Sequence, residues 1–256
     1  MRYRSTVLTV LGCALGFVLG ASSADAQLFT TTKELERQAR VQWLMMKRHT
    51  PVAPDARTQD YVQCITDRII DVLDESYGDF AWEVVVFDDD AANAFALPGG
   101  TVGVFTGIRR VADTPDALAA VIGHEIAHLT QNHVTERARR AARADALVLL
   151  GGAATGMGDL IRTGATIGLT LPFNRSQETE SDLVGLDYMA KAGFDPRASI
   201  YLWKNMSAAS RGAPPEFLST HPSTDRRLDD LVKGLAPALV AYNQALESGR
   251  QPNCRL

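Results

Sequence analysis

The stretch VIGHEIAHLTQNH, residues 121–133, places His124 and His128 four positions apart, with Glu125 directly after the first. Residues four apart lie on one face of an α-helix, so both imidazoles can reach the same ion. Glu125 lies about 100° around the helix, where it can accept a proton from water on the open side of a metal without being a ligand. The spacing predicts a catalytic zinc site. The alternative is a solvated helix that carries histidines incidentally.

The residues between and beside these side chains are small or apolar. They are Val121, Ile122, Gly123, Ile126, Ala127 and Leu129. Such a helix is predicted to be buried, and buried histidine and glutamate side chains cost free energy unless a partner satisfies them. The context therefore favours the metal site over the solvated helix.

A third ligand is needed, and the nearest histidine is a poor candidate. In the pattern H-E-x-x-H-x-x-G-x-x-H the last histidine would fall at position 134, where this chain has Val134, and Gln131 replaces the glycine. His133 is one position short and lies about 180° around a continuous helix from His124. We expect His133 to point away, either behind a ligand or at the surface.

A later helix offers a carboxylate ligand. Residues 174–196 have helical spacing, and Ser176 can cap the start. Glu178 and Asp182 are four apart, so Glu178 can bind zinc while Asp182 accepts the N–H of a zinc-binding histidine. Glu180 lies about 200° from Glu178 and faces elsewhere. The alternative for these residues is an acidic first turn that complements the helix dipole, which suits Glu180 better.

Periodicity along the remaining chain predicts an α+β fold that is mostly helical, with a small mixed sheet. Leu97-Pro98-Gly99-Gly100 has proline and glycine where a type II turn requires them. The expected elements are helices at 32–49 and 60–76, a strand within 82–90, strands on both sides of the turn within 93–107, and long helices from residue 115 onward.

The N-terminus has the pattern of a secretory signal peptide. A basic start is followed by an apolar run and by Ala24 and Ala26 in an A-x-A arrangement, so we expect residues 1–26 to be removed. A retained membrane anchor and a lipoprotein signal with Cys13 as the lipidated residue are alternatives. The net charge of −4 argues against a nucleic-acid-binding surface. Export predicts a periplasmic location, with outer-membrane association as a further option.

Removal of the signal leaves two cysteines, Cys64 and Cys254. In an exported chain this number predicts one disulfide, which would tie the C-terminal tail to an N-terminal helix. Two free buried thiols are the alternative. The wide spacing argues against a cysteine zinc site, which requires local pairs.

Two stretches after the histidines have unusual composition. Residues 137–145, RARRAARAD, are locally basic, and we interpret them as the solvated face of a helix, with a polyanion or anionic-lipid contact as the alternative. Residues 146–158 are mostly apolar but shorter than the roughly twenty residues that span a membrane. We expect them to pack or form a mobile flap near the site, with a membrane-touching loop as the alternative.

Four segments in this order resemble one family: NAFALPGGTVGVFTG, HEIAH, NRSQETESD and STHPSTDRRL. The chain is similar to the HtpX/BepA/LoiP-like zinc metallopeptidases, relatives of the CAAX prenyl endopeptidases, over residues 61–231. The resemblance implies a zincin-like domain with one zinc ion held by His124, His128 and Glu178. It also implies that Glu125 is the general base and that Asp182 supports a ligand.

The resemblance assigns roles to further residues. The segment NAFALPGG would pair with a substrate peptide as an added strand, although an ordinary buried hairpin is an alternative. His221 matches a histidine that in some members occupies the fourth zinc position and holds the enzyme inactive. Arg227 matches an arginine that could steady the oxyanion. Without the resemblance, His221 is a loop residue before Pro222.

Membrane helices and a C-terminal repeat array, which occur in some members, are not expected in residues 27–256. We expect these residues to form one metallopeptidase domain of a short exported type. The expected function is zinc-dependent hydrolysis of peptide bonds in unfolded or misassembled envelope proteins, with peripheral membrane contact as an option. The alternatives are a zinc-stabilised periplasmic chaperone that does not cut and a purely structural helical protein.

Overall fold

The computed structural model describes residues 31–140, 173–209, 216–221 and 225–256. The expected signal peptide, the alternative lipidation at Cys13 and the apolar stretch 146–158 lie outside these residues. No helix in the described ranges has the length and hydropathy needed to cross a membrane.

A mixed three-stranded sheet forms one part of the molecule, as the sequence predicts. The strands are β1 (Glu83–Phe87), β2 (Ala94–Leu97) and β3 (Thr101–Phe105), in the order β1-β3-β2. β1 is parallel to β3 and β2 is antiparallel to it. Among the described residues, β2 is therefore an edge strand.

The turn between β2 and β3 also agrees with the prediction. The Gly100 amide donates to the Leu97 carbonyl at 3.2 Å, and Gly99 has φ +94°. A type II turn requires a positive φ at this position, which glycine adopts at no steric cost. The tight turn brings the edge strand directly back along β3.

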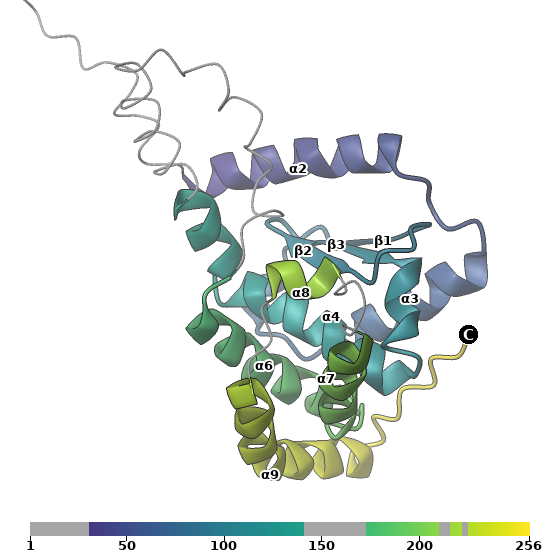
Figure 1. The fold of residues 1–256 in the computed structure, drawn as a ribbon, viewed down its shortest axis with the longest axis vertical. Coiled ribbons are helices and arrows are strands. Elements are labelled where there is room, and N and C mark those ends of the chain that lie inside the picture. Colours follow the sequence, from purple (N-terminus) through teal and green to yellow (C-terminus); the bar gives the residue numbers. More distant parts are fainter. Residues whose placement is uncertain (1–30, 141–172, 210–215, 222–224) are drawn as a thin grey trace, which may run out of the picture.

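Helices cover both faces of the sheet (Figure 1). Alternating side chains of each strand point to opposite faces. The aromatic side chains Phe87, Phe95 and Phe105 pack against α2 (Thr32–His49). The smaller β-branched and alanine side chains face the core that contains α3 (Ala56–Ile70) and α4 (Pro115–Thr130).

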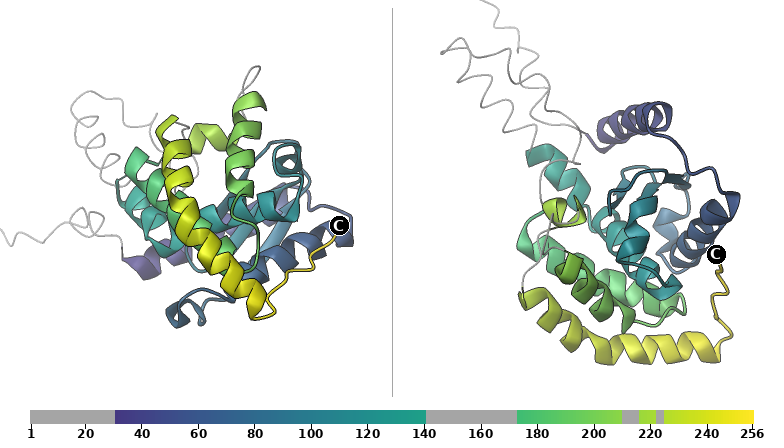
Figure 2. Two further views of the ribbon diagram at one scale, coloured as in Figure 1. Left: turned by 90° about the horizontal axis from the view of Figure 1, so that it is seen from below. Right: turned by 45° about the vertical axis from the view of Figure 1, so that its right-hand side comes forward.

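Three further helices lie on the side of α4 that is remote from the sheet (Figure 2). They are α6 (Arg175–Lys191), α7 (Ala198–Ala209) and α9 (Asp225–Glu247). The short α8 (Glu216–Thr220) lies beside the sheet, and its Phe217 amide donates to the Ala92 carbonyl just before β2. α6 packs against both α4 and α9, and α7 contacts the same two helices. α4 is consequently enclosed, and every residue from Ala117 to Thr130 is buried.

Two helix starts differ from the prediction. α6 is capped by Asn174, whose side chain accepts from the Gln177 amide while Gln177 returns a bond to the Asn174 backbone. This reciprocal capping box satisfies two backbone donors, so Ser176 lies inside the helix and is not the cap. α3 begins at Ala56, earlier than expected, because Asp55 caps it.

The predicted disulfide is confirmed. Cys64 in α3 is bonded to Cys254, which lies 190 positions later in the sequence, with 5.7 Å between the Cα atoms. The bond fixes the C-terminal tail to α3, as the sequence predicts.

Candidate metal centre

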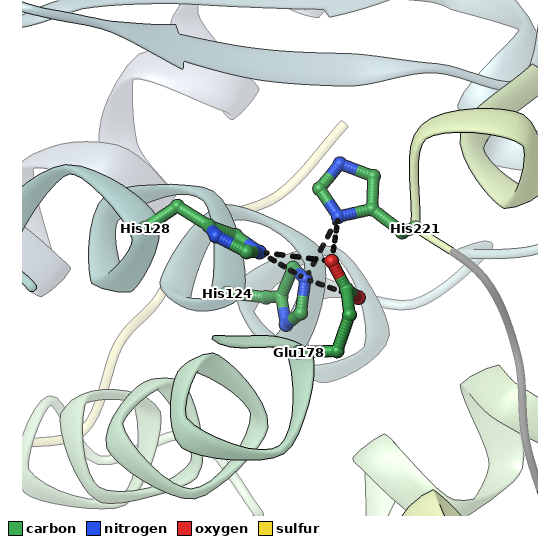
Figure 3. Close-up of side chains that lie close together, drawn as sticks. All are labelled: His124, His128, Glu178 and His221. Carbon is green, nitrogen blue, oxygen red and sulfur yellow. Dashed lines mark hydrogen bonds and ion pairs between the residues drawn. The ribbon is translucent and has the colours of Figure 1, made fainter. Parts of the chain in front are cut away.

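Four buried side chains point toward one another between α4 and α6 (Figure 3). His124 and His128 come from α4, Glu178 from the first turn of α6, and His221 from the position after α8. Each offers one potential ligand atom, and these atoms lie within 4.8 Å of one another. The structure thus brings together the three predicted ligands and the predicted fourth residue.

The histidine pair tests whether a cation fits. The Nε2 atoms of His124 and His128 are 3.0 Å apart, and His221 Nδ1 lies 3.1 Å from His124 Nε2. Lone pairs of neutral imidazoles would repel at these distances, so the arrangement requires a proton or a shared cation. Imidazole nitrogens and a carboxylate oxygen are the donor set that Zn²⁺ accepts in catalytic sites. The residues therefore fit a divalent metal ion.

Glu178 supplies the negative charge of the cluster. Its Oε1 lies 3.4 Å from His128 Nε2 and its Oε2 lies 3.6 Å from His124 Nε2. Burial opposes ionisation, but hydrogen bonds from the three histidines outweigh it and hold the pKa of Glu178 well below its ordinary value. Glu178 is therefore a carboxylate, as a ligand must be.

The two histidines of α4 differ in charge. Burial lowers the pKa of His128 well below its ordinary value, so this ring is neutral. Burial also acts to lower the pKa of His124, but Asp182 and Glu178 outweigh it and raise that pKa to about 9. A metal ion that binds His124 therefore displaces a proton at neutral pH.

Asp182 lies behind His124, one turn after Glu178. Its Oδ1 is 3.0 Å from His124 Nδ1, the nitrogen that faces away from the other ligands. Arg227 Nε and Nη2 donate to Asp182 at 2.6 and 2.7 Å. The carboxylate thus lies where it can fix the ring orientation and tautomer of His124, as its spacing from Glu178 predicts.

Arg227 approaches the centre from α9. Besides binding Asp182, its Nη1 lies 2.5 Å from Glu178 Oε2, and its guanidinium lies 3.8 Å from the centre of the Trp203 ring. Arg227 therefore contacts the carboxylates of α6 directly. Its predicted action on an oxyanion stays a prediction.

His133 contacts a candidate ligand from behind, which is one of the two positions predicted for it. α4 ends at Thr130, and Asn132 has φ +61°, so the chain turns before His133. His133 Nδ1 then lies 3.2 Å from His128 Nδ1, and its Nε2 lies 3.1 Å from Glu180. Neither His133 nor Glu180 belongs to the four-residue cluster.

Glu125 lies next to the cluster and opens onto a cleft. His221 Nε2 is 3.3 Å from Glu125 Oε1, and burial raises the pKa of Glu125. Both residues line a cavity of about 460 Å³ that also contacts α2, β2 and Phe105. The edge strand and the candidate general base therefore border one space.

Arg137 was missed by sequence reasoning. Residues 137–145 were expected to form a solvated face, but Arg137 is buried and lines the same cavity as Glu125. Its guanidinium lies 3.5 Å from the centre of the Phe173 ring. The sequence does contain a signal, because Val134 and Ala138 are apolar and four positions apart, which marks one inward face of a helix. Both residues are buried in the structure.

Comparison with known proteins agrees with this geometry. The model of peptidase family M48 matches residues 56–234 of the chain. The chain belongs to peptidase family M48. This confirms the resemblance inferred from the four motifs and the expected class of enzyme.

The chain is similar to named proteases from yeasts and bacteria. The chain is 40% identical over 183 residues to mitochondrial metalloendopeptidase OMA1 of Schizosaccharomyces pombe, covering 70% of this chain and 54% of that protein. It is 36% identical over 175 residues to the OMA1 of Saccharomyces cerevisiae, covering 64% and 50%. It is 30% identical over 199 residues to the beta-barrel assembly-enhancing protease of Yersinia pestis, covering 72% and 40%. The chain thus spans about half or less of the length of these relatives.

Proposed function

We propose that this M48 protein is a zinc-dependent endopeptidase that cuts unfolded or misassembled proteins of the cell envelope. The observation that carries the proposal is the convergence of His124, His128 and Glu178 beside Glu125, which lines the same cleft as residues of the edge strand β2. His124, His128 and Glu178 would hold the ion. Bound zinc would supply Lewis-acid polarisation of the scissile carbonyl and lower the pKa of water.

The protein's own groups account for binding and proton transfer. An extended peptide can pair with the open edge of β2 through main-chain hydrogen bonds, which depend little on side-chain identity. Glu125 then accepts the proton of the attacking water and returns it to the leaving amine. Burial raises the pKa of Glu125, which makes its carboxylate a stronger base at neutral pH.

The envelope role has two sources of support. Residues 1–26 have the pattern of an export signal, and relatives from Yersinia pestis and Escherichia coli carry the name beta-barrel assembly-enhancing protease. Periplasmic location, association with the outer membrane and peripheral membrane contact are parts of this proposal. The substrates would be polypeptides with exposed backbone, because only an unpaired backbone can add to a sheet edge.

The test is cleavage of casein by the metal-loaded protein, with and without a chelator. Because His221 lies against Glu125 and Glu178, the assay is run in the native and His221→Ala backgrounds. Glu125→Gln should retain metal but lose cleavage, whereas Glu247→Gln, exposed at the end of α9, should cut normally. Fragments from metal-replete Glu125→Gln would refute the assigned base. Casein binding without fragments from any variant would favour the chaperone.

A further inference from the structure

One stripe of α2 faces the cleft. Gln42, Met45, Met46 and His49 follow the i, i+3, i+4, i+7 spacing of one helix face, and all four line the cavity that contains Glu125 and His221. Residues 32–49 precede the segment matched by the M48 model, which begins at residue 56. This wall of the cleft therefore comes from outside the matched family segment.

The wall is held in place by the adjoining stripe of the same helix. Trp43 is fully buried and makes edge contacts with Phe87 and Phe95, at ring-centre distances of 5.7 and 6.2 Å. Its Nε1–H donates to Glu83 at 2.7 Å. An anchored helix presents its cleft-facing side chains at fixed positions, which lowers the ordering cost of binding.

The lining is apolar on both sides of this space. Met45 and Met46 come from α2, and Ala94, Phe95 and Phe105 come from the sheet. The charged groups Glu125 and Arg137 also line the cavity, which has a volume of about 460 Å³. Cavities of about 300–1,000 Å³ hold small ligands, with few polar groups fixing orientation. A large substrate side chain next to the scissile bond fits this description.

The methionines indicate how selective the wall is. Methionine is unbranched and polarizable, so it adapts to apolar partners of different shape, including aromatic rings. We infer that the Met45–Met46 face of α2 is a specificity subsite that selects large apolar side chains, aliphatic or aromatic, close to the bond being cut. This inference rests on the proposed peptidase function. It explains preference for unfolded chains, which expose such side chains.

Met45 allows a clean test, because it is 50% exposed and its neighbour Leu44 is 51% exposed. Met45 lines the cavity, whereas Leu44 does not contribute to its lining. The variants are Met45→Gln, Met45→Glu and the matched control Leu44→Gln. Equal exposure makes general destabilisation similar in the two glutamine variants, and thermal melts would check this.

The substrates are quenched fluorescent peptides that carry Leu, Phe, Gln or Lys at one varied position. In successive peptide sets this position moves along the sequence, from one side of the cleavage site to the other. The native protein should favour Leu and Phe over Gln by about tenfold in kcat/KM at one position. Met45→Gln should reduce that ratio several-fold, and Met45→Glu should favour Lys there. Leu44→Gln should leave every ratio unchanged.

Two results would overturn the inference: an unchanged Leu-to-Gln ratio in both Met45 variants, or an equal change in Leu44→Gln. Affinities of the same peptides for Glu125→Gln, measured by fluorescence polarisation, give a second readout. If neither the native protein nor His221→Ala cuts any peptide, the proposed function fails. The subsite is then tested by the ratio of Leu-peptide to Gln-peptide affinity, measured for Glu125→Gln and for the double variant with Met45→Gln. A smaller ratio in the double variant supports the subsite, and an equal ratio contradicts it.

Discussion

Gly123 of α4 and Gly185 of α6 bring the two helices into direct backbone contact. A β-carbon on Gly185 would lie 2.7 Å from the backbone nitrogen of His124, and one on Gly123 would lie 2.9 Å from the Gly185 carbonyl oxygen. Contacts this short do not fit a β-carbon. The two glycines therefore set the separation across which Glu178 reaches the histidines of α4.

Gly185→Ala should separate the helices and weaken the metal centre. Overpacking of this kind costs about 1–3 kcal/mol of unfolding free energy, and a ligand shifted away from the histidines binds metal less tightly. The measurements are urea unfolding and competition for zinc with a chromogenic chelator. Asp187→Ala, on the exposed side of α6, is the control. Native zinc affinity in Gly185→Ala would contradict this role for the glycine contact.

Asp182→Asn should reduce zinc affinity about 10–100-fold, the usual effect of removing a group that orients a histidine ligand. Asparagine keeps the shape of the side chain but loses the charge beside His124 Nδ1 and Arg227. Chelator competition measures the affinity. Asp187→Asn, on the same helix, should bind zinc normally. An Asp182→Asn protein that also binds normally would exclude an orienting role.

Much of the site follows from helical periodicity alone. A spacing of four predicts that His124 and His128 share a face, and the same spacing places Glu178 and Asp182 together on α6. These residues lie within regular helices, where sequence distance determines direction. Alternation and turn residues similarly predict the hairpin of β2 and β3.

The remaining features depend on where regular structure stops. A residue other than glycine with positive φ, Asn132, ends the run of α4, so the helical angle calculated for His133 no longer applies. After this turn Arg137 points inward, although Glu136, Arg139 and Arg140 around it are charged and exposed. The sequence also does not predict which face of α2 lines the cleft. The position of the sheet decides this, because it covers one face of the helix.

His221→Ala should raise peptidase activity while metal is retained. The His221 ring lies 3.1 Å from Glu178 and 3.3 Å from Glu125, so it occupies space that substrate and water need. Its removal leaves the three predicted ligands in place. Casein cleavage rates and metal content measured together test this. Lower activity with unchanged metal content would indicate that His221 assists the reaction.

Arg137→Gln should lower kcat/KM by about tenfold, the order expected for losing a charge-assisted contact in a buried site. Burial lowers the pKa of Arg137 to about 10, so the group remains a cation at neutral pH and can attract a substrate carbonyl or carboxylate. Arg139→Gln, two positions away and exposed, is the control. Equal kcat/KM values for both variants and the native protein would show that Arg137 does not contribute to substrate binding.

Glu83 should make the docking of α2 sensitive to acid. Burial acts to raise the pKa of this carboxylate, but hydrogen bonds from Lys47 and Trp43 outweigh it and lower the pKa. A lowered folded-state pKa means that the carboxylate contributes stability above the ordinary glutamate value of about 4.3. That contribution is lost as the pH falls through the lowered value.

Two variants separate the charge of Glu83 from its role as a hydrogen-bond acceptor. Glu83→Gln keeps an acceptor for the buried Trp43 indole and should cost less than about 1 kcal/mol at pH 7, because the Lys47–Glu83 pair is partly exposed. Glu83→Ala should cost about 1–3 kcal/mol more, since it leaves the indole N–H without an acceptor. Urea unfolding at pH 7 and at pH 3 should show a smaller acid-induced loss in Glu83→Gln than in the native protein. The same loss in both would mean that other carboxylates account for the acid sensitivity and that the Glu83 charge does not hold α2 against the sheet.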